Sequence, residues 1–133
     1  MVIDTSAVAA ILFQEADGER YVLALEKAAV RLVSAVTRVE MSCVIEGRRG
    51  EIGRRALERF LAVTGIEIVP VTPDQATLAI GAFRAFGKGR HRAGLNIGDC
   101  FSYGLSKASG LPLLFKGDDF TQTDIHAALP RTK

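Results

Sequence analysis

The feature that most constrains this fold is the alternation of short apolar runs with longer segments of helical periodicity. Short apolar runs are typical of buried β-strands, and apolar residues repeated three and four positions apart indicate amphipathic helices. Alternation of this kind predicts an α/β domain whose central, mostly parallel β-sheet is flanked by helices on both faces. The predicted strands are 1–4, 30–36, 66–71 and 111–115, and the predicted helices are 6–14, 17–28, 37–48, 52–63, 74–86 and 95–110.

Glycine and proline mark several of these boundaries. We expect Gly50 to separate the two helices on either side of it, Pro73 to begin the helix 74–86, and Gly110 to end the helix 95–110. Within the helix 17–28, the residues expected to face the core are Val22, Leu23 and Leu25.

Length and composition bound the class of protein. A chain of 133 residues that is 48% hydrophobic can bury one core, so we expect a single domain over residues 1–133. No apolar run approaches the roughly 18 residues that span a bilayer, and no export signal is visible, which predicts a cytoplasmic protein without a membrane anchor. Cys43 and Cys100 lie far apart without zinc-type spacing, and we expect both to be small core residues in a reducing compartment.

Charge is unevenly distributed although the net charge is only +2. Residues 48–59 contain five Arg and two Glu, and residues 84–92, which we call the basic segment, contain four cations and no acid. A concentration of cations of this kind is suited to contact with a polyanion. Residues 48–59 fit an ordinary solvated helix face equally well. The glycines in and beside the basic segment predict a flexible loop there.

Acidic residues occur where ligands bind in parallel sheets, beyond the carboxyl ends of the strands. Asp4 directly follows the first predicted strand, after three apolar residues. Glu40 lies on an apolar helix face, with Val36, Cys43 and Val44 one turn away. The other acids at such positions are Asp99, in the first turn of its helix, and Asp118 and Asp119, directly after the fourth strand.

Each acid also has a purely structural interpretation. Asp4 is suited to cap the helix that follows it, and Asn96 with Asp99 resembles an N-cap with a first-turn acid. The two aspartates of the sequence GDDF fit ordinary turn chemistry. Glu40 is the hardest to explain in this way, because a carboxylate on an apolar face is costly without a partner and no Lys lies one turn away.

A bound divalent cation explains all of these acids together. Carboxylates about 4 Å apart repel by roughly 4 kcal/mol per pair at an effective dielectric constant near 20, and a cation relieves that repulsion. Oxygen ligands without an organised His or Cys favour Mg²⁺ or Mn²⁺. Such ions activate water and stabilise charge on phosphoryl oxygens during in-line displacement. Together with the basic segment, this chemistry predicts phosphodiester hydrolysis.

Four stretches, in chain order and covering essentially the whole sequence, carry these acids: "MVIDTSAVAAIL", "SAVTRVEMSCVIEGR", "KGRHRAGLNIGDCFSYGLSK" and "LPLLFKGDDFTQTDI". They resemble the signature blocks of the PIN domain family, in particular the VapC toxins of bacterial VapBC toxin–antitoxin pairs. The resemblance implies a PIN-like three-layer fold and a metal-dependent endoribonuclease that cleaves tRNA or rRNA and inhibits translation. It also implies a VapB-like antitoxin partner, a homodimer and higher-order toxin–antitoxin complexes.

The resemblance also implies roles for the acids, matched block by block. Asp4 and Asp99 would bind one or two Mg²⁺ or Mn²⁺ ions directly, and Glu40 would bind directly or through water. The fourth acid is expected to be Asp119, which precedes Phe as in the usual "DF" ending of the family, while Asp118 remains an alternative.

The remaining expected site residues support these acids or the RNA. Ser6 and Asn96 would orient a ligand or water, and Ser6 is equally suited to a helix cap. His91 is an alternative acid or base, although a His in a basic loop more often contacts RNA. The flanking phosphates would be bound by Lys88, Arg90 and Arg92.

Two other functional classes are compatible with parts of the sequence. A haloacid dehalogenase-like phosphatase would use Asp4 as a nucleophile but needs a second Asp two positions later, where this chain has Ser6. A non-catalytic PIN-fold module that only binds RNA would show missing acids, and none of the four is missing.

Overall fold

The computed structural model describes residues 1–131, in which four strands pair in parallel in the order β3-β2-β1-β4. The expected α/β fold with a parallel sheet is therefore confirmed. Each predicted strand has a counterpart, and so does each predicted helix, because the predicted helices 37–48 and 52–63 are the two parts of the kinked helix α3. A short 3₁₀ helix, η1, was not predicted. In chain order the elements are β1 (Val2–Ile3), α1 (Thr5–Leu12), α2 (Gly18–Lys27), β2 (Leu32–Ser34), α3 (Ala35–Thr64), β3 (Glu67–Val69), α4 (Pro73–Phe86), α5 (Ile97–Ser109), β4 (Leu113–Leu114) and η1 (Phe120–Gln122).

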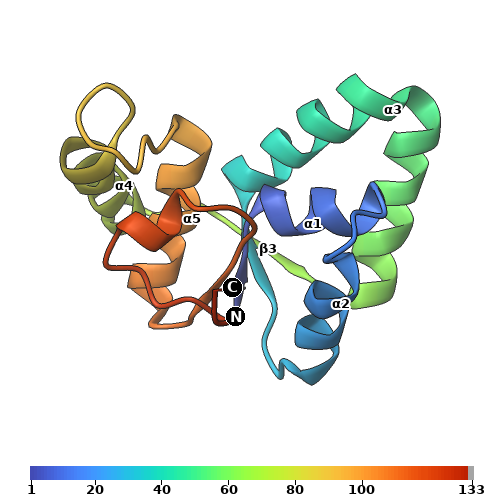
Figure 1. The fold of residues 1–133 in the computed structure, drawn as a ribbon. Coiled ribbons are helices and arrows are strands. Elements are labelled where there is room, and N and C mark those ends of the chain that lie inside the picture. Colours follow the sequence, from blue (N-terminus) through green and yellow to red (C-terminus); the bar gives the residue numbers. More distant parts are fainter. Residues whose placement is uncertain (132–133) are drawn as a thin grey trace.

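Helices cover the sheet on both faces, with α1, α2 and α3 on one side and α4 and α5 on the other (Figure 1). Successive strand residues point to opposite faces, so adjacent positions belong to different cores. Ile3 and Leu114 pack in the core beneath α1 to α3, whereas Val2 and Leu113 pack in the core beneath α4 and α5. All four side chains are fully buried, which explains why the strands are apolar without alternation.

Glycine sets the ends and the kink of the long helices, as the sequence predicted. Gly50 has φ +58° inside α3, where the helix changes direction, and Gly110 ends α5 in the left-handed region at φ +69°. Pro73 begins α4 after the capping residue Thr72, whose side chain accepts a hydrogen bond from the Gln75 amide. Although α3 is 30 residues long, no helix among residues 1–131 is long and apolar enough to cross a membrane.

Three expectations about burial were wrong. In α2 the buried side chains include Tyr21 and Leu25, whereas Leu23 is 46% exposed, because the helix presents a face rotated from the one expected. Cys43 and Val44 are both exposed, so these apolar neighbours of Glu40 do not form a core face. The core face of α3 instead contains Thr37, Met41 and Ile45, and Cys100 is buried as predicted.

Candidate active site

The site lies at the edge of the sheet where the strands end. The chain leaves β1 toward β2 on one side, and β4 later pairs with the other side of β1, so the strand order reverses at β1. In open parallel sheets, ligands bind in the crevice at such a point, beyond the carboxyl ends of the strands. Asp4 follows β1, α3 follows β2, and the loop of residues 115–119 follows β4, so the expected acids come to one region from different elements.

Asp4 is 2% exposed and serves as the N-cap of α1. Its Oδ2 accepts hydrogen bonds from the Ser6 amide at 3.0 Å and the Ser6 hydroxyl at 2.7 Å, which confirms the capping interpretation. Its Oδ1 accepts a third bond, from the Ser102 hydroxyl at 2.7 Å, which a cap does not require. Three donors therefore satisfy this buried carboxylate and hold it in one orientation.

Ser6 connects this carboxylate to the loop that follows β4. The Lys116 amide donates to the Ser6 Oγ at 3.0 Å, while the Ser6 hydroxyl donates to Asp4. The Lys116 ammonium binds Glu15 and Asp17, with its contact to Asp17 Oδ1 at 2.8 Å. The loop is thereby attached both to Asp4 and to the turn between α1 and α2.

Glu40 is half-buried, and its Oε1 accepts a hydrogen bond from the Thr5 hydroxyl. Its other oxygen lies against the first turn of α5, since a Cβ added to Gly98 would come within 1.9 Å of Oε2. Burial raises the pKa of Glu40, the hydrogen bond from Thr5 partly offsets this, and the negative charge of Asp4 raises it further. Glu40 therefore lies close enough to Asp4 for the two carboxylates to repel.

Asp99 and Asn96 form a capping box at the start of α5, as their spacing predicted. Asn96 Oδ1 accepts from the Asp99 amide at 2.8 Å, and Asp99 Oδ2 accepts from the Asn96 amide at 3.0 Å. Burial and the charge of Asp4 raise the pKa of Asp99 to about 7, with smaller contributions from Glu40 and Asp119. The carboxylates on four elements are therefore electrostatically coupled.

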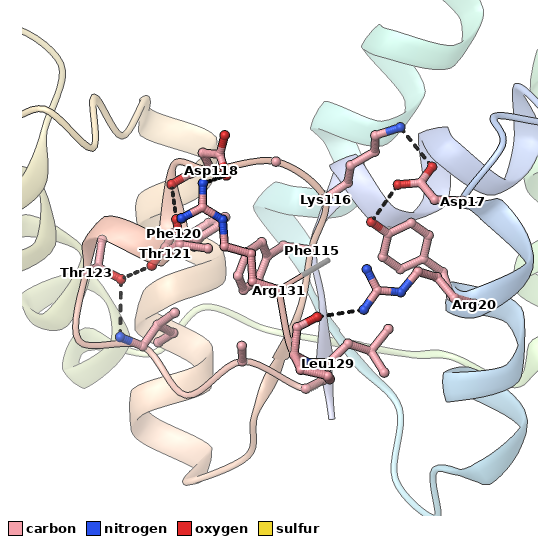
Figure 2. Close-up of a pocket in the computed structure, with 16 residues that line it drawn as sticks. Asp17, Arg20, Phe115, Lys116, Asp118, Phe120, Thr121, Thr123, Leu129 and Arg131 are labelled. Carbon is pink, nitrogen blue, oxygen red and sulfur yellow. Dashed lines mark hydrogen bonds and ion pairs between the residues drawn. The ribbon is translucent and has the colours of Figure 1, made fainter. Parts of the chain in front are cut away.

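The two adjacent aspartates after β4 lie in different surroundings. Asp118 forms an ion pair with Arg131 at 3.0 Å and lines a groove of about 660 Å³, also lined by Arg20 and Lys116 (Figure 2). Asp119 precedes η1 without a side-chain capping bond, and its charge contributes to the raised pKa of Asp99. Of the two, Asp119 is the one coupled to the other acids.

The basic segment is more ordered than its glycines indicated. The Lys88 amide donates to the Leu95 carbonyl at 2.9 Å, and the Gly94 amide donates to the His91 carbonyl at 3.0 Å, so backbone bonds close the loop. The His91 ring helps to hold the loop: its Nδ1 accepts a hydrogen bond from the Ala93 amide at 3.0 Å, and the ring packs edge-on against Phe86. The three exposed cations of the segment's loop are Lys88, Arg90 and Arg92.

Most of the arginines among residues 48–59 contact other side chains of the protein. The Arg48 guanidinium lies 3.9 Å from the ring centre of Phe13, and Arg54 and Arg55 both pair with Glu51. These contacts favour the interpretation of 48–59 as a solvated helix face that supports α3.

The acids fit a hard divalent cation by their chemistry. Asp4, Glu40, Asp99 and Asp119 offer only oxygen donors, and none of them forms an ion pair within residues 1–131. Over the same residues, no three His, Cys, Asp or Glu side chains are arranged as a ready-made metal-binding group. A cation held by these carboxylates would neutralise the mutual repulsion that, after burial, raises the pKa values of Glu40 and Asp99.

Sequence reasoning missed four residues that hold these acids in place. Thr5 donates to Glu40, Gly98 leaves room for its carboxylate, and Ser102 donates to Asp4 and is linked to Thr37. A signal was present for Ser102, which lies three residues after Asp99 on the same predicted helix and is therefore on the same face.

Comparisons with known proteins agree with this geometry. A family model described as the PIN domain matches residues 1–125. Ribonuclease VapC30 of Mycobacterium tuberculosis (strain H37Rv) is 55% identical over 131 residues, which cover 98% of this chain and 100% of the relative. Ribonuclease VapC of Mycolicibacterium smegmatis is 52% identical over 127 residues, which cover 96% and 98%. The chain therefore belongs to the PIN domain family, and within it to the VapC ribonucleases.

A solved structure supports the fold independently of close sequence similarity. The crystal structure of Mycobacterium tuberculosis VapC20, a toxin described as cleaving the sarcin-ricin loop, matches with a TM-score of 0.75 at 17% identity. The match covers 93% of this chain and 95% of that one. The family resemblance and the PIN-like three-layer fold expected from the sequence are both confirmed.

Proposed function

We propose that this chain is a VapC-type endoribonuclease toxin that depends on Mg²⁺ or Mn²⁺, cleaves tRNA or rRNA in the cytoplasm and thereby inhibits translation. The observation that carries the metal dependence is the cluster of Asp4, Glu40, Asp99 and Asp119, whose charges are coupled and without ion pairs in residues 1–131. The ribonuclease activity is supported by the close relatives. We propose further that residues 1–133 form one domain, since a single sheet organises both cores.

Each acid has a distinct part in this proposal. Asp4 and Asp99 would hold the ion directly, and Glu40 would hold it directly or through water. When bound, Mg²⁺ or Mn²⁺ would activate water and stabilise charge on the phosphoryl oxygen. Ser6 keeps Asp4 oriented, and Asn96 holds the Asp99 carboxylate through its backbone amide.

The RNA would be positioned by the basic segment. Lys88, Arg90 and Arg92 are exposed on the loop before α5, whose first turn carries Asp99. Because the backbone bonds close this loop, the backbone that carries the cations needs little ordering when a strand binds. Contacts to phosphates on either side of the scissile bond would place the reacting phosphate near the acids.

The first experiment is cleavage of total cellular RNA by the purified protein. We expect fragments with Mg²⁺ or Mn²⁺, none with EDTA, and none with the variant Asp4→Asn, which keeps a good helix cap and should remain folded. Asp74→Asn, an exposed first-turn acid of α4, is the matched control and should cleave normally. A folded protein that binds RNA but cleaves neither total RNA nor purified tRNA and rRNA would instead be a non-catalytic module.

The fourth acid is tested by a matched pair of variants. Asp119→Asn should reduce cleavage strongly, because it removes one of the carboxylates proposed to hold the ion, the one whose charge acts on Asp99. Asp118→Asn should cost little, because that side chain is exposed and paired with Arg131. The reverse result would assign the role to Asp118.

The proposed partners are a VapB-like antitoxin and a second copy of this chain. The antitoxin is proposed from the VapC relatives, and it would neutralise the toxin, alone or in a higher-order complex. The homodimer is supported by an apolar groove of about 370 Å³ on α4 and α5, where Ile80, Phe83 and Ile97 are 52%, 41% and 76% exposed. Light scattering should show a dimer that Ile80→Lys dissociates, whereas Ile52→Lys on α3 should leave it intact.

A further inference from the structure

Two buried hydroxyl groups, those of Thr37 and Ser102, form a hydrogen-bonded series that ends on the carboxylate of Asp4 and is called the hydroxyl chain below. The Ser102 hydroxyl donates to Asp4 Oδ1 at 2.7 Å, and the Thr37 and Ser102 hydroxyl oxygens are 3.1 Å apart. Thr37 and Ser102 are fully buried, and Asp4 is 2% exposed. These three side chains come from α3, α5 and the end of β1.

The direction of the hydrogen bonds follows from counting protons. Each hydroxyl has one proton to donate, and that of Ser102 is used on Asp4. Thr37 must therefore be the donor in its contact with Ser102. Thr37 thus donates to Ser102, and Ser102 donates to Asp4. The Asp4 carboxylate is the final acceptor, and this hydrogen bond holds it in one orientation.

The positions of the two hydroxyl residues connect them to the other acids. Thr37 lies three residues before Glu40 on α3, and Ser102 lies three residues after Asp99 on α5. Residues three apart on a helix occupy the same face, one turn from each other. The hydroxyl chain thus joins the two helical turns that carry Glu40 and Asp99 to the carboxylate of Asp4.

We propose that Ser102 and Thr37 are positioning residues that orient Asp4 and fix its spacing from Glu40 and Asp99, so that the acids can bind one divalent ion together. This proposal rests on the metal dependence proposed above. Oxygen ligands of metals are commonly held by such hydrogen-bond partners, whose loss weakens metal binding about 10- to 100-fold. A buried pair of hydroxyls that serves the core alone would not affect metal affinity.

The chain offers a matched control for Ser102. Ser106 lies one turn later on α5, is 3% exposed, and donates to the Leu111 carbonyl at 2.7 Å. Ser102→Ala and Ser106→Ala therefore remove a buried serine hydroxyl with a hydrogen bond of equal length from the same helix. Only the first loses a bond to Asp4.

The test measures Mn²⁺ affinity by calorimetry on the folded chain without RNA, together with urea unfolding and RNA cleavage. Ser102→Ala should weaken Mn²⁺ binding at least 10-fold and reduce cleavage, while Ser106→Ala should bind Mn²⁺ as the parent does. Thr37→Val keeps the side-chain shape without the hydroxyl and should weaken Mn²⁺ binding by several-fold. Thr37→Ser keeps the hydroxyl and should bind Mn²⁺ as the parent does.

Two results would overturn the proposal, and they differ. If the parent binds Mn²⁺ and Ser102→Ala binds it equally well, or no worse than Ser106→Ala, the hydroxyls serve only the core. If the parent itself binds neither Mn²⁺ nor Mg²⁺, the proposed metal dependence fails and the positioning role falls with it. Should Ser102→Ala not fold, the pair Thr37→Val and Thr37→Ser still decides, because equal Mn²⁺ affinity in those two variants refutes the role.

Discussion

The contact between Gly98 and Glu40 gives the sharpest test of the site. Replacing Gly98 with Ala would place a Cβ 1.9 Å from Glu40 Oε2 and 2.5 Å from its Cδ. Ordinary van der Waals contact begins at 3.4 Å, so the carboxylate oxygen must withdraw by about 1.5 Å. The atoms that must move are the far end of a flexible side chain, so the fold should accept the change.

The expected result is a loss of activity without a loss of stability. A misplacement of about 1 Å in a catalytic site can cost about 10²-fold in rate, so Gly98→Ala should lower kcat/KM for RNA cleavage by that order. Ala favours a helix over Gly by up to about 1 kcal/mol, which argues against unfolding as the cause. Cleavage kinetics and urea unfolding of the same preparation separate the two effects.

Two further variants control this prediction. Gly47→Ala on α3, where an added Cβ meets nothing within 4 Å, should cleave RNA at the normal rate. In the double variant Gly98→Ala with Glu40→Asp, the acid is shorter by one methylene and makes room for the new Cβ. The double variant should therefore lose less cleavage activity than the losses of the two single variants added together. Normal cleavage by Gly98→Ala would refute the reasoning, because Glu40 would then not be needed where the structure places it.

Three other predictions follow from individual contacts. Gly50→Ala should lower the free energy of unfolding by about 1–3 kcal/mol in urea, because φ is +58° and ψ is −143°, a backbone conformation that only glycine adopts readily; an unchanged midpoint would contradict this. Hydrogen bonds from Tyr103 and, to a smaller extent, Lys107 lower the pKa of Asp124. The stability that the ionised Asp124 gives to the fold is therefore fully present above the ordinary pKa of 3.8, and it is lost as the pH falls through the lowered pKa. Asp124→Asn should thus lower the free energy of unfolding by at most about 1 kcal/mol near pH 6, since the side chain is exposed. At a pH low enough to protonate Asp124, the variant and the parent should unfold at the same urea concentration. Replacing the three loop cations of the basic segment with Gln should weaken binding to all RNA sequences and reduce the slope of log K against log salt by about 2, and an unchanged slope would place the RNA elsewhere.

The sequence predicted the elements of this fold well because hydrophobic periodicity and backbone chemistry are local. The kink at Gly50 and the end of α5 at Gly110 follow from the positive φ angles that glycine adopts readily. The face of α2 was predicted less well: Leu23 was expected in the core and is exposed, whereas Tyr21 is buried. Periodicity indicates that a helix has an apolar face, but only the packing partner decides which residues at its margin are covered.

For the candidate site, the sequence by itself nominated the acids and their chemistry. Their positions at strand ends and first turns are local properties, and the likeness to a known family assigned them roles. What the tertiary structure decided is how they are held: the bond from Ser102 to Asp4 joins residues 98 positions apart, and Asp118 differs from its neighbour because Arg131 lies beside it. Sequence patterns report the character of each segment, whereas contacts between distant residues exist only after the segments have packed.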